Sequence, residues 1–144
     1  MSQLAPAGVL PAATQAVARR ILVVEDEPEL RRSLTLRLKA AGYDVYTAVN
    51  GQEAILVAQR IQPHLALLDL GLPGANGHSV ARQWRSNGRS PFPVIVLTSR
   101  EDVEDRALAG ELGAAAYLTK PYEPEALLSA IRCVLAPDDR AEPA

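Results

Sequence analysis

The stretch that decides the fold is Ile21-Leu-Val-Val-Glu-Asp-Glu-Pro28, in which an apolar run ends in three acids and a proline. Leucine and β-branched residues in an unbroken row are typical of a strand buried on both faces, as in a parallel sheet. Pro28 suits the first turn of a helix, and apolar residues then recur at helical spacing up to Gly42, which is placed to end it. The sequence therefore predicts a strand over residues 21–24 followed by a helix.

The same alternation of strand-length apolar runs with helical patterns continues along the chain. Further strands are expected at Tyr43–Thr47, Leu65–Leu68, Pro93–Leu97 and Ala115–Leu118. After a turn at Asn50-Gly51, helices are expected over Gln52–Arg60, around Val80 and Trp84, over about Asp102–Leu112, and around Leu127 and Ile131. Five such units in succession predict an α/β fold built on a parallel sheet.

Length and composition limit the classes of function. At 144 residues the chain has the size of one domain, so we expect residues 19–136 to fold, with tails at 1–18 and 137–144 and no second domain. A formal net charge of -2 gives no field that attracts nucleic acid or an anionic membrane. No apolar run could cross a bilayer, residues 1–18 lack a basic signal start, and the single Cys133 cannot form an internal disulfide. We expect a cytoplasmic protein.

Polar side chains gather where the predicted strands end, which is where open parallel sheets bind ligands. These residues are Glu25, Asp26, Asp69, Thr98 and Lys120. Clustered carboxylates repel one another, so we expect a cation among them, and Mg²⁺ prefers such oxygen ligands together with a phosphate oxygen. An aspartate there can itself accept a phosphoryl group, whose oxygens Thr98 and Lys120 would orient and neutralise.

Four segments at four successive strand ends match a known family in order and spacing. They are Ile21-Leu-Val-Val-Glu-Asp-Glu-Pro28, Leu67-Leu-Asp-Leu-Gly-Leu-Pro-Gly-Ala-Asn-Gly77, Val94-Ile-Val-Leu-Thr-Ser99 and Tyr117-Leu-Thr-Lys-Pro121. Over about residues 19–136 the chain resembles the receiver domain of bacterial two-component response regulators. The resemblance implies a flavodoxin-like, doubly wound fold with five parallel strands in the order 2-1-3-4-5.

The resemblance also implies the phosphorylation and metal sites. Asp69 matches the aspartate that accepts the phosphoryl group. Glu25 and Asp26 match the acidic pair that, with Asp69 and the backbone carbonyl of Gly71, holds Mg²⁺ or alternatively Mn²⁺. Gly71 and Arg100 occupy positions that tune the lifetime of the phosphoryl group in similar domains.

Three further residues match the switching machinery of such domains. Thr98 matches the hydroxyl that reaches for the phosphoryl group, Tyr117 the aromatic that responds to it, and Lys120 the lysine that pairs with it. The Lys120–Pro121 peptide bond is expected to be cis. The resemblance implies phosphoryl transfer from a sensor histidine kinase or a histidine phosphotransfer protein. Signalling to a downstream protein would then use the face of the fourth helix, fifth strand and fifth helix.

Alternatives to a stand-alone signalling receiver stay open. The residues after Asp69 look like the branch that carries a winged-helix DNA-binding domain, so the chain could be the receiver of a longer regulator. Ala115 and Ala116 stand where that branch commonly has two acids, so we expect a monomer or a weak, phosphorylation-dependent dimer. A phosphatase of similar fold is disfavoured because Gly71 stands where such enzymes need a second acid. A phosphorylation-independent interaction domain is the remaining alternative.

Overall fold

The computed structural model describes residues 18–71, 76–84, 92–98, 107, 109–110 and 113–136. The elements in these ranges are, in chain order, β2 (Arg20–Val24), α2 (Pro28–Ala40), β3 (Asp44–Ala48), α3 (Gly51–Ile61), β4 (Leu65–Asp69), α4 (Asn76–Trp84), β5 (Val94–Thr98), β6 (Ala116–Thr119) and α6 (Pro124–Val134). The predicted alternation of strands and helices is confirmed for these elements. Most of the helix predicted over 102–112, and both predicted tails apart from residue 18, lie outside the described residues.

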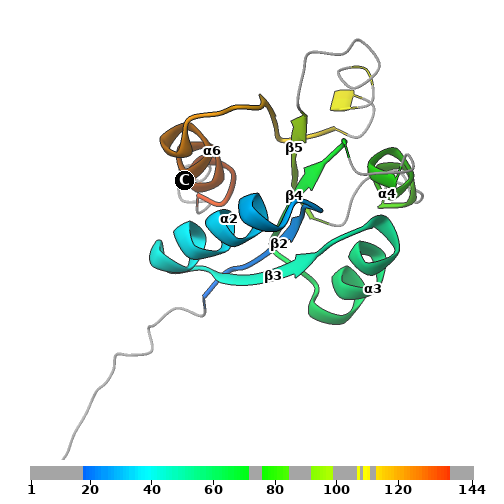
Figure 1. Cartoon of the computed structure of the whole chain (residues 1–144), viewed down its shortest axis with the longest axis horizontal. Coiled ribbons are helices and arrows are strands. Elements are labelled where there is room, and N and C mark those ends of the chain that lie inside the picture. Colours follow the sequence, from blue (N-terminus) through cyan, green and yellow to red (C-terminus); the bar gives the residue numbers. More distant parts are fainter. Residues whose placement is uncertain are drawn as a thin grey trace, which may run out of the picture.

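The five strands form one parallel sheet in the order β3-β2-β4-β5-β6, which is 2-1-3-4-5 when they are counted along the chain. The expected fold is therefore confirmed. Helices α2 and α6 cover one face of the sheet, and α3 and α4 cover the other (Figure 1). The order reverses at β2, which has β3 on one side and β4 on the other, so the sheet has its switch point beside β2.

Alternate residues of the central strands pack into two hydrophobic cores, one on each face of the sheet. Ile21 and Val23 of β2 pack on the α2 and α6 side, whereas Leu22 and Val24 pack on the α3 and α4 side. All four are at most 1% exposed, which explains why β2 is an apolar run rather than an alternating pattern. The core on the α3 and α4 side also contains Trp84, whose ring contacts that of Phe92 edge-on with centroids 5.0 Å apart.

The ends of α2 agree with the sequence, but the expected turn at Asn50-Gly51 is wrong. Helix α2 begins at Pro28, and Gly42 follows its end with a φ of +99°, a conformation that glycine adopts at little cost. Asn50 is instead the N-cap of α3, with an extended φ of -154°, and its Oδ1 accepts a hydrogen bond from the Glu53 amide at 2.8 Å. Gly51 is the first residue of that helix.

Several strand boundaries differ from the prediction by one residue. β3 begins at Asp44 because the Tyr43 amide still donates to the Leu38 carbonyl at the exit of α2. At the other end of the sheet, Thr98 and Thr119 pair in register and so belong to β5 and β6. No helix in the described part of the chain is both long and apolar enough to span a membrane.

Candidate functional site

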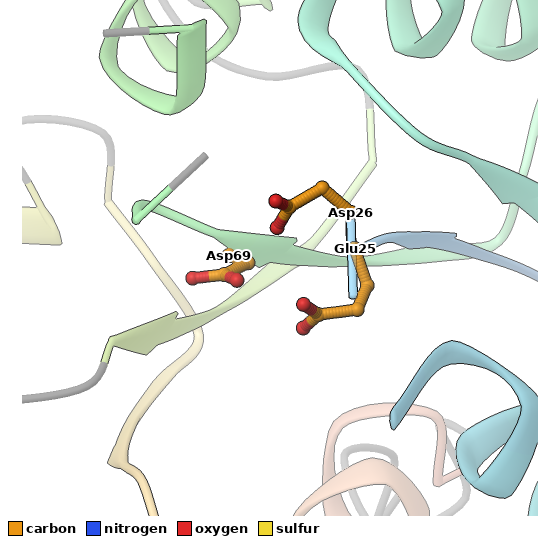
Figure 2. A group of neighbouring side chains, drawn as sticks. All are labelled: Glu25, Asp26 and Asp69. Atoms are coloured by element: carbon orange, nitrogen blue, oxygen red, sulfur yellow. The ribbon is translucent and has the colours of Figure 1, made fainter. Parts of the chain in front are cut away.

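The site is built at the carboxyl ends of β2 and β4, which are neighbours in the sheet. Glu25 and Asp26 directly follow β2, and Asp69 is the last residue of β4. Ligand oxygens of the three carboxylates all lie within 4.8 Å of one another. Figure 2 shows their carboxyl groups on the same side of the two strand ends. Glu25 and Asp69 are buried, at 1% and 4% exposure, whereas Asp26 is exposed.

Lys120 reaches this cluster from the end of β6, two strands away from β4. Its Nζ lies 2.9 Å from Asp69 Oδ2 and 3.1 Å from Glu25 Oε1, so one ammonium donates to both buried acids. The Lys120–Pro121 bond that follows is cis, the state that the resemblance implies. The structure thus brings together the residues that the sequence places at three different strand ends.

The remaining oxygens of the buried acids are bonded to backbone amides. The Glu27 amide donates to Glu25 Oε2 at 3.2 Å, and the Gly71 amide donates to Asp69 Oδ1 at 2.8 Å. A Cβ at position 71 would lie only 3.3 Å from the same Asp69 oxygen. Glycine at this position therefore avoids a close contact between a side chain and the Asp69 carboxylate.

Burial and like charge shift the protonation of Glu25. Desolvation, with the nearby Asp69 charge, raises the pKa of Glu25 from 4.5 to about 7, although Lys120 opposes the shift. For Lys120, desolvation disfavours the ammonium. The hydrogen bonds and charges of Asp69 and Glu25 outweigh that effect and raise the pKa of Lys120. Lys120 is therefore charged at neutral pH, and Glu25 is held near its titration point.

Thr98 and Tyr117 lie on the two strands next to this cluster. Thr98 ends β5 and is buried at 2% exposure, and its carbonyl accepts the Lys120 amide at 2.6 Å. Tyr117 lies on β6, pairs in register with Val96 and packs against the core on the α3 and α4 side. Arg100, expected to tune the phosphoryl lifetime, lies outside the described residues.

The sequence reasoning missed one residue that contacts the acidic pair. Arg31 of α2 donates from Nη1 to the carbonyl oxygens of Glu25 and Asp26, at 3.1 and 3.3 Å. In the sequence, Arg31 is marked only by its position one turn into the helix that follows these acids. Arg32 has nearly the same position, so the sequence does not show which arginine makes the contact.

The donor set fits a hard divalent cation. Three carboxylates against the single Lys120 ammonium leave a formal excess of two negative charges when all are ionised. All side-chain donors are oxygen atoms, which Mg²⁺ and Mn²⁺ prefer. The exposure of Asp26 gives this side of the cluster access to water, which Mg²⁺ usually retains in its coordination shell.

Comparison with known proteins identifies the family. The sequence model described as the response regulator receiver domain matches residues 21–132. The chain belongs to the response regulator receiver family. Receiver structures with the same fold include a chemotaxis protein CheY4 of Vibrio cholerae, 30% identical with a TM-score of 0.75 over 83% of this chain and 100% of that one. Another is the BeF3-activated N-terminal receiver domain of RstA from Klebsiella pneumoniae, 33% identical with a TM-score of 0.73 over 82% and 99%.

Curated relatives of this receiver are transcriptional regulators. A probable transcriptional regulator ycf27 of Porphyridium aerugineum is 43% identical over 122 residues, which are 85% of this chain and 50% of that protein. The DNA-binding response regulator MtrA of Mycolicibacterium smegmatis is 39% identical over 117 residues, which are 81% of this chain and 50% of that protein. The chain thus spans about half the length of the curated relatives it matches.

Proposed function

We propose that Asp69 accepts a phosphoryl group from a phosphohistidine of a sensor kinase or phosphotransfer protein, in a reaction that needs Mg²⁺ or Mn²⁺. Membership of the receiver family supports this proposal. The observation that carries it is the environment of Asp69. This carboxylate is buried, is bonded by Lys120 through one oxygen, and lies within 4.8 Å of the two acids after β2.

In the proposed transfer, an oxygen of Asp69 attacks phosphorus while the bond between phosphorus and the donor's imidazole nitrogen breaks. The electron pair of that bond stays on the imidazole, which takes up a proton from water and leaves as histidine, and Asp69 becomes an acyl phosphate. The cation would be held by Glu25, Asp26 and Asp69 with the backbone carbonyl of Gly71, and when bound it would supply positive charge that offsets the phosphoryl oxygens. Lys120 Nζ, already 2.9 Å from Asp69, neutralises further charge.

The acyl phosphate is then lost slowly to water, so the chain acts as a signalling domain with only self-phosphorylation and self-dephosphorylation chemistry. Gly71 and Arg100 tune that loss in our proposal. Gly71 does so by placing no side-chain atom beside the Asp69 carboxylate, since it lacks the Cβ that would lie 3.3 Å from Oδ1.

The output is a change of shape that starts at Thr98. Its hydroxyl bonds a phosphoryl oxygen, Tyr117 fills the vacated space, and the face formed by residues 102–112, β6 and α6 changes toward a downstream protein. The relative MtrA is named as a DNA-binding response regulator, but we propose no nucleic-acid contact for this chain. In our proposal residues 19–136 form the receiver domain, between tails at residues 1–18 and 137–144. Because Ala115 and Ala116 are uncharged, we propose a monomer or a weak, phosphorylation-dependent dimer.

The test is phosphorylation of the intact chain by acetyl phosphate with Mg²⁺, followed by mass spectrometry. We expect the wild type to gain one acid-stable, base-labile phosphoryl group, and a chelator to prevent it. Asp69→Asn should gain none. Asp44→Asn, which changes an exposed aspartate of β3, should behave as the wild type. No adduct, together with no metal-dependent response to beryllofluoride, would instead support the phosphorylation-independent interaction domain.

A further inference from the structure

One arginine side chain ties the backbone of the acidic pair to α2. Arg31 Nη1 donates to the carbonyl of Glu25 at 3.1 Å and to that of Asp26 at 3.3 Å. We propose that Arg31 is a positioning residue that fixes these two residues, and thereby sets the distances from their carboxylates to Asp69 on which cation binding depends. This inference rests on the proposed function of the site.

Arg31 is itself well placed to act as an anchor. Its amide donates to the Glu27 carbonyl at 2.9 Å, in the first turn of hydrogen bonds of α2. Its carbonyl accepts the Thr35 hydroxyl at 2.8 Å. The side chain therefore extends from a backbone held on both sides toward the strand end that precedes the helix.

The acidic pair has few other supports. The Glu25 amide donates to the Ala48 carbonyl at 3.0 Å, and Lys120 Nζ donates to Glu25 Oε1 at 3.1 Å. The Glu27 amide bonds the Glu25 carboxylate, a contact inside the segment itself. For Asp26, the contact from Arg31 is the one hydrogen bond found among the described residues, and the side chain of Asp26 is exposed. Asp26 is therefore the carboxylate whose position depends most on Arg31.

Three explanations of the Arg31 contacts predict different effects of the loss of Arg31 on metal binding. A nearby cation repels Mg²⁺, so if Arg31 acted by its charge alone, neutralising it would tighten metal binding. If Arg31 only stabilised the fold, its loss would lower the melting temperature and leave the metal affinity of the folded protein unchanged. If it positions the acids, its loss weakens metal binding, because Mg²⁺ demands near-octahedral geometry. The direction of the change therefore distinguishes the three explanations.

The experiment measures Mn²⁺ binding to the intact chain by calorimetry at fixed ionic strength, beside thermal unfolding without metal. We expect Arg31→Gln to bind Mn²⁺ about tenfold more weakly than the wild type, the lower end of the range for residues that orient metal ligands. Arg32→Gln is the matched control, since Arg32 is exposed, is adjacent and loses the same charge. It should change the affinity by less than about twofold, because exposed charges interact weakly.

A second variant separates geometry from charge. Arg31→Lys keeps the positive charge but replaces the planar fork by a single ammonium, so we expect it to weaken Mn²⁺ binding as well. It also decides the question if Arg31→Gln does not fold. Mn²⁺ binding that equals or exceeds that of the wild type in every Arg31 variant that folds would overturn the inference alone. Failure of the wild type to bind Mn²⁺ at all would overturn the proposed metal site and this inference together.

Discussion

At the residue scale, Gly71 lies directly against the carboxylate of Asp69. Its amide donates to Asp69 Oδ1 at 2.8 Å, so the backbone approaches the carboxylate as closely as a hydrogen bond allows. A methyl group at this position would lie 3.3 Å from the same oxygen, closer than ordinary van der Waals contact. The Gly71 backbone and any side chain added at position 71 would thus contact the same oxygen of Asp69.

We predict that Gly71→Ala slows both the gain and the loss of the phosphoryl group. The added methyl crowds the attacking carboxylate and then covers the acyl phosphate from water. A change of about threefold in each rate, corresponding to about 0.7 kcal/mol in each barrier, is expected. The measurement is a time course of intact mass with acetyl phosphate, continued after the donor is removed.

The control for this prediction is Asp44→Asn, an exposed change at a β3 residue that pairs with Arg20 at the opposite end of the sheet from the site. Asp44→Asn should leave both rates close to those of the wild type. Unchanged rates in Gly71→Ala would show that the crowding seen in the structure is relieved by a small shift of the loop. Faster phosphoryl loss would mean that the methyl group does not shield the phosphoryl group.

The sequence could predict which residues meet in the site, but not how they are bonded. Parallel strands bring their carboxyl ends to one edge, so Glu25, Asp69 and Lys120 could be placed together without coordinates. The sharing of one ammonium between two acids depends on the path of the loop after β6. The contact from Arg31 depends on how α2 is joined to β2, and residue spacing does not encode that geometry.

At the element scale, the start of α3 shows where local reasoning fails. Asn-Gly favours both tight turns and helix starts, and the sequence alone does not choose between them. In the structure Asn50 Oδ1 accepts the Glu53 amide, and Glu53 Oε1 accepts the Val49 amide, each at 2.8 Å. The side chains of Asn50 and Glu53 thus satisfy two amides at the start of α3.

We predict that Asn50→Ala destabilises the protein by about 1 kcal/mol, because the φ of -154° suits alanine and only the cap is lost. Asn50→Asp keeps the acceptor oxygen and should stay within about 0.5 kcal/mol of the wild type. Urea denaturation followed by circular dichroism gives both values. Gln52→Ala, an exposed change in the same helical turn, is the control. Equal stability of Asn50→Ala and Asn50→Asp would show that the cap contributes nothing.

At the scale of the whole molecule, two titrating groups give stability opposite dependences on pH. The pKa of Glu25 is raised from 4.5 to about 7, so between these values the folded protein binds more protons than the unfolded chain. The Glu25 contribution to stability therefore falls as pH rises through this window. Ionised Glu25 destabilises the folded state because its charge is buried beside the charge of Asp69, and the same burial raises its pKa.

His64, at the other end of the sheet, gives stability the opposite dependence on pH. Its Nδ1 accepts the Arg20 amide at 2.9 Å, and its own amide donates to the Arg20 carbonyl at 2.8 Å. Burial and the charges of Arg20 and Arg19 lower the pKa of His64 below 6.5. Below pH 6.5 the unfolded chain then binds more protons at this residue, so its contribution to stability rises as pH rises toward 6.5. The two effects therefore have opposite signs in the wild type.

A difference between variants isolates the contribution of Glu25, since His64 is the same in both chains. We predict that metal-free Glu25→Gln is more stable than the wild type at about pH 8, by at most about 3 kcal/mol, the value for a pKa that rises from 4.5 to about 7. The difference should shrink as pH falls toward 4.5 and vanish well below it, where Glu25 is protonated in both states. Urea denaturation in a chelator at several pH values measures it, with Asp44→Asn as an exposed control.

Added Mg²⁺ should then stabilise the wild type more than Glu25→Gln, because only a carboxylate at this position binds the cation strongly, and binding to the folded state adds to its stability. The advantage of the variant at high pH would shrink accordingly. A constant difference across the whole pH range would show that Glu25 ionises in the folded protein as it does in the unfolded chain. In that case its burial beside Asp69 carries no energetic cost for which the cation compensates.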